Sequence, residues 1–125
     1  MRTALVLVIG LLGASTALAE KPSAALQGEL QTAMLTYMES GLVDGGYTYI
    51  DPKTQALKTV YPSNVHPFVV VLGKDYVVCS VMVDEEGNSI TVDYVVRSIG
   101  GEHKVVQMLL EDRPALKGAM AKLKQ

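Results

Sequence analysis

The chain has 125 residues, enough for one domain, and hydrophobic residues make up 49% of it, as is typical of a globular protein. It contains a single cysteine, Cys79, which excludes an intramolecular disulfide and with it the small disulfide-rich secreted scaffolds. The formal net charge of −2 makes an acidic surface that repels phosphate backbones and anionic lipid, so we expect neither nucleic acid nor a membrane surface as a partner.

The first 19 residues, MRTALVLVIGLLGASTALA, are typical of a secretory signal. Arg2 supplies a charged end, an unbroken apolar run covers residues 4–12, and small residues end the segment. We predict a signal peptide over residues 1–19 and a single domain over residues 20–125, in a protein exported to the periplasm or secreted. An uncleaved membrane anchor is the alternative.

An amphipathic helix is expected to open the domain. Ser23 is a suitable N-cap, and the helix is predicted to run to about Ser40, where Gly41 provides a left-handed stop. Apolar side chains recur at three- and four-residue spacings and form one stripe: Leu26, Leu30, Ala33, Met34, Tyr37 and Met38.

From residue 46 onward the apolar period changes to two, which is typical of an antiparallel meander. PSNVHP, at residues 62–67, is expected to interrupt the second apolar run, and the glycines at 100 and 101 to form a hairpin turn. A short C-terminal helix is predicted from about Pro114, with an apolar stripe at Leu116, Ala119, Met120 and Leu123. The predicted fold class is therefore α+β, with a meander of about five to six strands between two helices.

Cys79 is predicted to be a buried, unreactive thiol. In a strand over residues 76–84 it belongs to a valine-rich set, and a four-residue loop at 85–88 places it opposite Tyr94. We expect no positive neighbour and neither histidine within reach, so burial is expected to raise the pKa of the thiol. A reactive thiol and an intermolecular bridge are the alternatives.

The other face of the last strands mixes apolar and polar residues, which makes it the candidate ligand or partner face. In the predicted register Ser80 lies opposite Asp93, and Asp93 lies opposite Met108. Three interpretations stay open: Asp93 simply faces water, Asp93 serves as a general base or ligand anchor in a pocket under a helix, or the face binds a protein partner or a second copy. The residues of this candidate face are Tyr76, Val78, Ser80, Met82, Asp93, Val95 and Met108.

No cofactor is expected. His66 and His103, together with the acidic residues near them, show no metal-ligand spacing, so no metal is predicted either. The glycines form no phosphate-binding pattern, since none opens a helix after a strand.

A leading helix followed by a curved antiparallel meander resembles the cystatin-like and NTF2-like group of folds. VDYVVRSIGGEHKVVQM, at residues 92–108, is similar to the end strands of many members. The inhibitor motif of true cystatins, Q-x-V-x-G, is absent where DPKTQALKTV stands, so protease inhibition is not expected. The chain also resembles small exported bacterial proteins.

The resemblance has two functional implications. NTF2-like proteins include non-catalytic binding or assembly modules, and the first expectation is therefore a non-catalytic binding or accessory module. They also include enzymes that use a pocket carboxylate, and Asp93 is the position here that matches this role. The alternative is a small NTF2-like enzyme in which Asp93 is the general base of a pocket on the sheet face.

Overall fold

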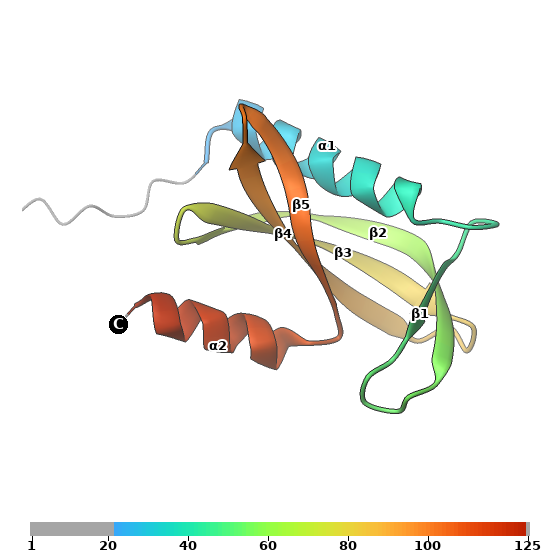
Figure 1. Ribbon diagram of the computed structural model, residues 1–125. Coiled ribbons are helices and arrows are strands. Elements are labelled where there is room, and N and C mark those ends of the chain that lie inside the picture. Colours follow the sequence, from blue (N-terminus) through green and yellow to red (C-terminus); the bar gives the residue numbers. More distant parts are fainter. Residues whose placement is uncertain (1–21, 125) are drawn as a thin grey trace, which may run out of the picture.

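The computed structural model describes residues 22–124, so the predicted signal peptide at residues 1–19 lies outside the described part of the chain. Two helices lie on opposite faces of a five-stranded antiparallel sheet with the order β1-β2-β3-β4-β5 (Figure 1). The predicted α+β class, with one helix before an antiparallel meander and another after it along the chain, is confirmed. The elements are α1 (Ala24–Ser40), β1 (Tyr47–Ile50), β2 (Leu57–Leu72), β3 (Asp75–Asp84), β4 (Ser89–Ile99), β5 (Glu102–Leu110) and α2 (Arg113–Leu123).

Helix α1 has the predicted limits. Its N-terminus is capped by Ser23, whose hydroxyl accepts a hydrogen bond from the Leu26 N–H at 3.2 Å. Gly41 follows the last helical residue, Ser40, but its φ is −92°, so the expected left-handed stop is wrong. A side chain at position 41 would have its Cβ 3.2 Å from the Tyr47 ring, so close packing accounts for the glycine. In the described part of the chain, neither helix is long and apolar enough to cross a membrane.

The segment at 62–67 does not interrupt the sheet as predicted. It lies inside β2, and two shifts of register against β3 accommodate it. Its prolines, Pro62 and Pro67, lie beyond Leu57–Val60, the part of β2 that pairs with β1. Prolines are tolerated where a strand lies at an edge or carries a bulge. Because β2 continues through this segment as one strand, the meander has five strands.

The pairing of β3 with β4 is shifted by one residue from the predicted register. Cys79 lies opposite Asp93 rather than opposite Tyr94, and Ser80 lies opposite Val92. A one-residue shift moves every side chain of one strand to the other face relative to its partner strand. The predicted pairing of Ser80 with Asp93 is therefore wrong, and Asp93 shares a face with Cys79.

The loop between β3 and β4 explains this shift. The predicted register needs a four-residue loop at 85–88, but the Asp84 N–H donates to the Asn88 carbonyl at 2.9 Å and closes the hairpin earlier. The resulting loop, 85–87, ends with Gly87 at a φ of 84°, the left-handed position that three-residue hairpin loops require. The Asp84 carboxylate also accepts the Asn88 N–H at 2.8 Å, which stabilises this turn.

The hairpin between β4 and β5 turns at Gly100 and Gly101, as predicted. Their φ angles are 59° and 83°, and a two-residue type I′ turn needs positive φ at both positions. One register shift occurs farther along this strand pair. As a result Asp93 lies opposite Leu109, and its predicted pairing with Met108 is wrong.

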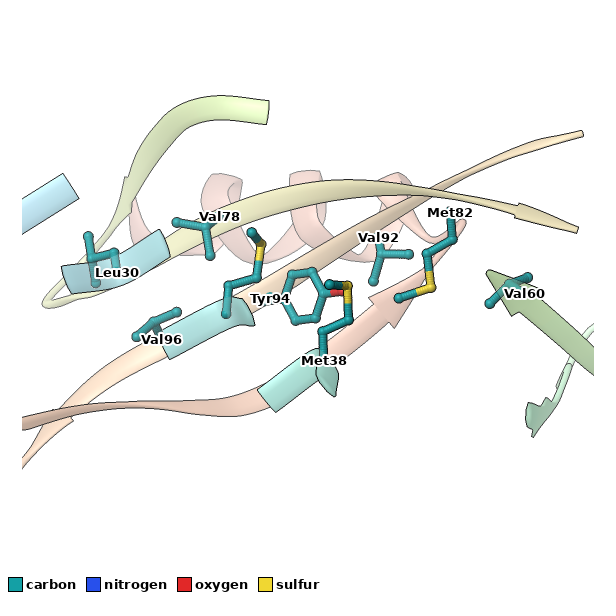
Figure 2. Close-up of a cluster of buried hydrophobic side chains, with 9 residues drawn as sticks. Leu30, Met38, Val60, Val78, Met82, Val92, Tyr94 and Val96 are labelled. Carbon is teal, nitrogen blue, oxygen red and sulfur yellow. The ribbon is translucent and has the colours of Figure 1, made fainter. Parts of the chain in front are cut away.

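The main hydrophobic core lies between α1 and the sheet, and Figure 2 shows its side chains converging from both sides. Two polar side chains in this core form a hydrogen bond with each other, because the Ser80 hydroxyl lies 2.9 Å from the Tyr94 hydroxyl within the buried layer. Burial raises the pKa of Tyr94 to about 12, so this phenol stays neutral and remains a hydrogen-bonding partner. The buried members of the core are Leu30, Met34, Met38, Val60, Val78, Met82, Val92, Tyr94 and Val96.

Helix α2 covers part of the opposite face. Asp112 caps its N-terminus by accepting a backbone N–H at 3.3 Å, and Pro114 lies in its first turn, as predicted. Of the predicted apolar stripe only Leu116 is buried, whereas Leu123 is 57% exposed. The second face of the sheet is therefore only partly covered.

Candidate functional site

A pocket of about 480 Å³ lies between the second sheet face and α2. Strands β2, β3 and β4 form one side, and the first turns of α2 form the other. Four of its residues, from β3, β4 and α2, are more than nine-tenths buried and make the floor: Val77, Cys79, Asp93 and Leu116. The remaining residues form the rim: His66, Phe68, Val70 and Arg113.

The rim of the pocket on β2 is aromatic and open. The rings of His66 and Phe68 stack with centroids 6.4 Å apart and an interplanar angle of 25°. Phe68 remains 70% exposed, and Val70 next to it on the same face is also exposed. An apolar group entering the pocket would therefore contact this rim before reaching the floor.

An ion pair between the sheet and α2 lies at the polar end of the pocket. The Arg113 Nε–H donates to Asp93 Oδ2 at 2.7 Å, and Arg113 Nη2 lies 3.3 Å from Cys79 Sγ. The Asp93 side chain is 3% exposed, whereas that of Arg113 is 51% exposed. A buried carboxylate in the middle of a strand is costly unless a charged partner compensates it, and Arg113 provides this compensation.

The turn before α2 positions Arg113. Glu111 adopts a φ of 50°, which reverses the chain after β5, and its N–H donates to the Thr91 carbonyl at 2.8 Å. The Glu111 carboxylate accepts the Thr91 N–H at 2.7 Å, so two hydrogen bonds fix this residue to β4. Lys53 adds a third contact by donating to the Glu111 carbonyl at 2.7 Å. Arg113, the first residue of α2, is therefore held beside Asp93.

Cys79 is buried, as predicted, but its surroundings differ from the expectation. Arg113 is a positive neighbour, and His66 lines the same pocket although it was expected to lie apart from the thiol. Burial still raises the pKa of Cys79, the charge of Asp93 adds to this effect, and Arg113 opposes it. A thiol with a raised pKa is mostly protonated at neutral pH and is therefore a poor nucleophile.

Thiol reagents should label Cys79 slowly in the native protein and rapidly in denaturant. The reasons are the 8% exposure of this residue and the upward shift of its pKa. The measurement is the time course of thiol labelling at constant pH, with and without urea. Native labelling as fast as in urea would show that the floor of the pocket is open to solvent.

The residues of the predicted ligand or partner face do not share one face. Asp93 and Val95 lie on the second face, and Asp93 lines the pocket. The other members lie on the α1 face, within the core or packed against it: Tyr76, Val78, Ser80, Met82 and Met108. The β3 residues are separated from Asp93 by the one-residue shift of register between β3 and β4, and Met108 is separated from it by the register shift between β4 and β5.

Sequence reasoning missed Arg113 as a partner of Asp93. The presence of a carboxylate inside an apolar strand is a signal that could have indicated such a partner. Each of the two buried carboxylates of the described chain pairs with an arginine. The other pair joins Asp75 to Arg97 through two hydrogen bonds of 3.0 and 2.9 Å. A carboxylate in an otherwise apolar strand therefore indicates that an arginine lies nearby in the fold.

No protein-family model, curated protein or solved structure matches the chain. Within residues 22–124 no group of three or more His, Cys, Asp or Glu side chains is arranged to hold a metal ion. What the pocket offers is an apolar surface and one ion pair, which suits binding and orientation of a ligand.

A larger hollow of about 1060 Å³ lies between α1 and the β5 hairpin. None of the residues that line it is buried, and its lining includes small side chains such as Ala25 and Thr32. His103 and Glu29 approach each other there at 3.0 Å, with the Glu29 side chain 63% exposed. This hollow is an open groove, whereas the pocket beside α2 has a buried floor in which Asp93 pairs with Arg113 of the rim, so the pocket is the candidate site.

Proposed function

We propose that the protein is a non-catalytic binding or accessory module, exported to the periplasm or secreted, that holds a small ligand between its second sheet face and α2. The observation that carries this proposal is the pocket of about 480 Å³ with a buried floor. Small-molecule sites are typically concave, mostly apolar and about 300–1,000 Å³ in volume, with few polar groups. The protonated thiol of Cys79 and the Asp93–Arg113 pair are consistent with orienting a ligand without attacking it.

The arrangement of elements supports a relationship to the cystatin-like and NTF2-like group of folds. A leading helix packs on one face of an antiparallel meander, as the resemblance of the sequence implies. Members of that group include non-catalytic binding modules, which agrees with the proposed function. We propose this relationship for the whole domain.

Partly filling the pocket should weaken ligand binding without unfolding the protein. We expect the Val70→Trp substitution to weaken binding of the neutral dye Nile red at least about tenfold, because Val70 lies on the rim and a larger side chain fills the pocket. The matched control is Val106→Trp, at a β5 valine of comparable exposure that does not line the pocket. Fluorescence titration measures both affinities. Equal binding by the two variants, or no binding by the unmodified protein, would overturn the proposal.

A catalytic role for Asp93 is the second candidate function, favoured by the position of this carboxylate in the pocket floor. A general base must reach the proton that it removes. In this site, however, Oδ2 of Asp93 is engaged by Arg113 at 2.7 Å. Mass spectrometry of a bound ligand after prolonged incubation separates the two functions. Unchanged ligand supports the binding module, whereas turnover that Asp93→Asn removes supports the enzyme.

A further inference from the structure

The walls of the pocket beside α2 favour an apolar ligand body. Val70, Val77 and Leu116 present aliphatic surface, and the stacked rings of Phe68 and His66 form the entrance. Burial of apolar area is favourable in proportion to the area removed from water. The largest gain therefore comes from a ligand whose main part is hydrocarbon or an uncharged ring.

The charges of the pocket compensate each other. Among residues 22–124, Asp93 and Arg113 are the only acidic, lysine or arginine side chains that line it, and their charged atoms are 2.7 Å apart. An anion that approaches Arg113 is also repelled by Asp93, and a cation that approaches Asp93 is repelled by Arg113. The remaining titratable groups are the thiol of Cys79, whose pKa is raised, and the ring of His66 on the rim. An ionised ligand head would lose hydration here with little net attraction in return.

Arg113 still has hydrogen-bond donors for a neutral ligand. A guanidinium carries five N–H groups; Nε–H donates to Asp93 and an Nη2–H points to Cys79, while the side chain is half exposed. The remaining N–H groups suit an oxygen acceptor such as a carbonyl or hydroxyl. A ligand with one such oxygen would be oriented by Arg113 while its apolar part lies against Val77 and Leu116.

We infer that the ligand is an uncharged, predominantly apolar small molecule that carries an oxygen acceptor for Arg113, such as an alcohol, ester or amide. This inference rests on the proposed function and specifies the chemistry of the same site. Asp93 is a positioning residue in it, because it holds the Arg113 side chain and cancels the charge that would otherwise select an anion.

Three probes with the same alkyl chain test this inference: decanol below its solubility limit, and decanoate and decylammonium below their micelle concentrations. Competition with Nile red measures their affinities for the full domain. We expect the unmodified protein to bind decanol at least about tenfold more tightly than either charged probe. In the Asp93→Asn variant Arg113 loses its counter-charge, and the preference should shift about tenfold toward decanoate. The matched control is Asp75→Asn. Asp75 is a buried carboxylate like Asp93 but lies outside the pocket, so this substitution should leave the order of the three affinities unchanged.

The outcomes separate the inference from the proposed function. Binding of decanoate or decylammonium in preference to decanol overturns the inference and leaves the binding function in place. Failure of the unmodified protein to bind any probe overturns both. Circular dichroism reports whether the Asp93→Asn variant folds, and if it does not, the ranking of the three probes by the unmodified protein decides alone.

Discussion

Replacing Arg113 with methionine should lower the free energy of unfolding by about 2–3 kcal/mol. The substitution leaves the carboxylate of Asp93, whose side chain is 3% exposed, without its charged partner. Removing one member of a fully buried pair typically costs ~3–5 kcal/mol. We expect a smaller loss here because the Arg113 side chain is half exposed, so this pair is not fully buried. Urea denaturation of both proteins gives the difference.

The two members of the pair should not be equivalent. Asp93→Asn leaves Arg113 unpaired but half exposed, where water can solvate it, so we expect a smaller loss of about 1 kcal/mol. The double variant should be more stable than Arg113→Met alone, because it leaves no buried charge uncompensated. The control is Lys104→Met, which breaks the exposed pair with Glu102 and should change stability by less than ~0.5 kcal/mol. A loss at Arg113 no larger than at Lys104 would contradict the role assigned to the pair.

Truncating Leu30 to alanine should cost about 3 kcal/mol. Leu30 is fully buried between α1 and the sheet, so the substitution leaves a cavity in the main core. The matched substitution on the other helix, Leu123→Ala, should cost less than ~0.5 kcal/mol because Leu123 is 57% exposed.

Urea denaturation of the two leucine variants measures both losses. A large difference means that Leu30 lies in the main core and that Leu123, at the end of α2, has little packing to lose. Equal losses at Leu30 and Leu123 would mean that Leu123 is packed as tightly as Leu30, which would contradict its 57% exposure.

Local signals in the sequence predicted the elements that depend on neighbouring residues. The cap at Ser23, the turn at Gly100 and Gly101, and the position of Pro114 each act within one turn of the chain, and all three have the expected role. One exception among local signals is Gly41, where contact with a residue on another element explains the glycine.

The register of β3 against β4 could not be predicted from hydrophobic pattern. Both faces of β3 are apolar, and they carry Val77 and Cys79 on one side and Val78 and Met82 on the other, so burial does not distinguish the two registers. The three-residue loop that ends at Gly87 determines the register of β3 against β4 instead. Burial of Cys79 was predictable for the same reason, since a thiol on either face of this strand is covered.

The candidate site depends on contacts that the sequence does not display. Arg113 lies 20 residues from Asp93 and reaches it only because the turn at Glu111 directs α2 back under the sheet. His66 lines the pocket because β2 continues through the proline-containing segment, which pattern reasoning interpreted as a break. Residues of a site that converge through long-range folding need the structure to be identified.

The most direct test of a ligand site between the second sheet face and α2 is a methyl NMR titration of the protein with decanol. We expect shifts at Val70, Val77 and Leu116, which line the pocket, and unchanged methyl signals at Leu30 and Met82, which lie in the core beneath α1. Shifts concentrated at Leu30 and Met82, with the three pocket methyl groups unchanged, would contradict the site.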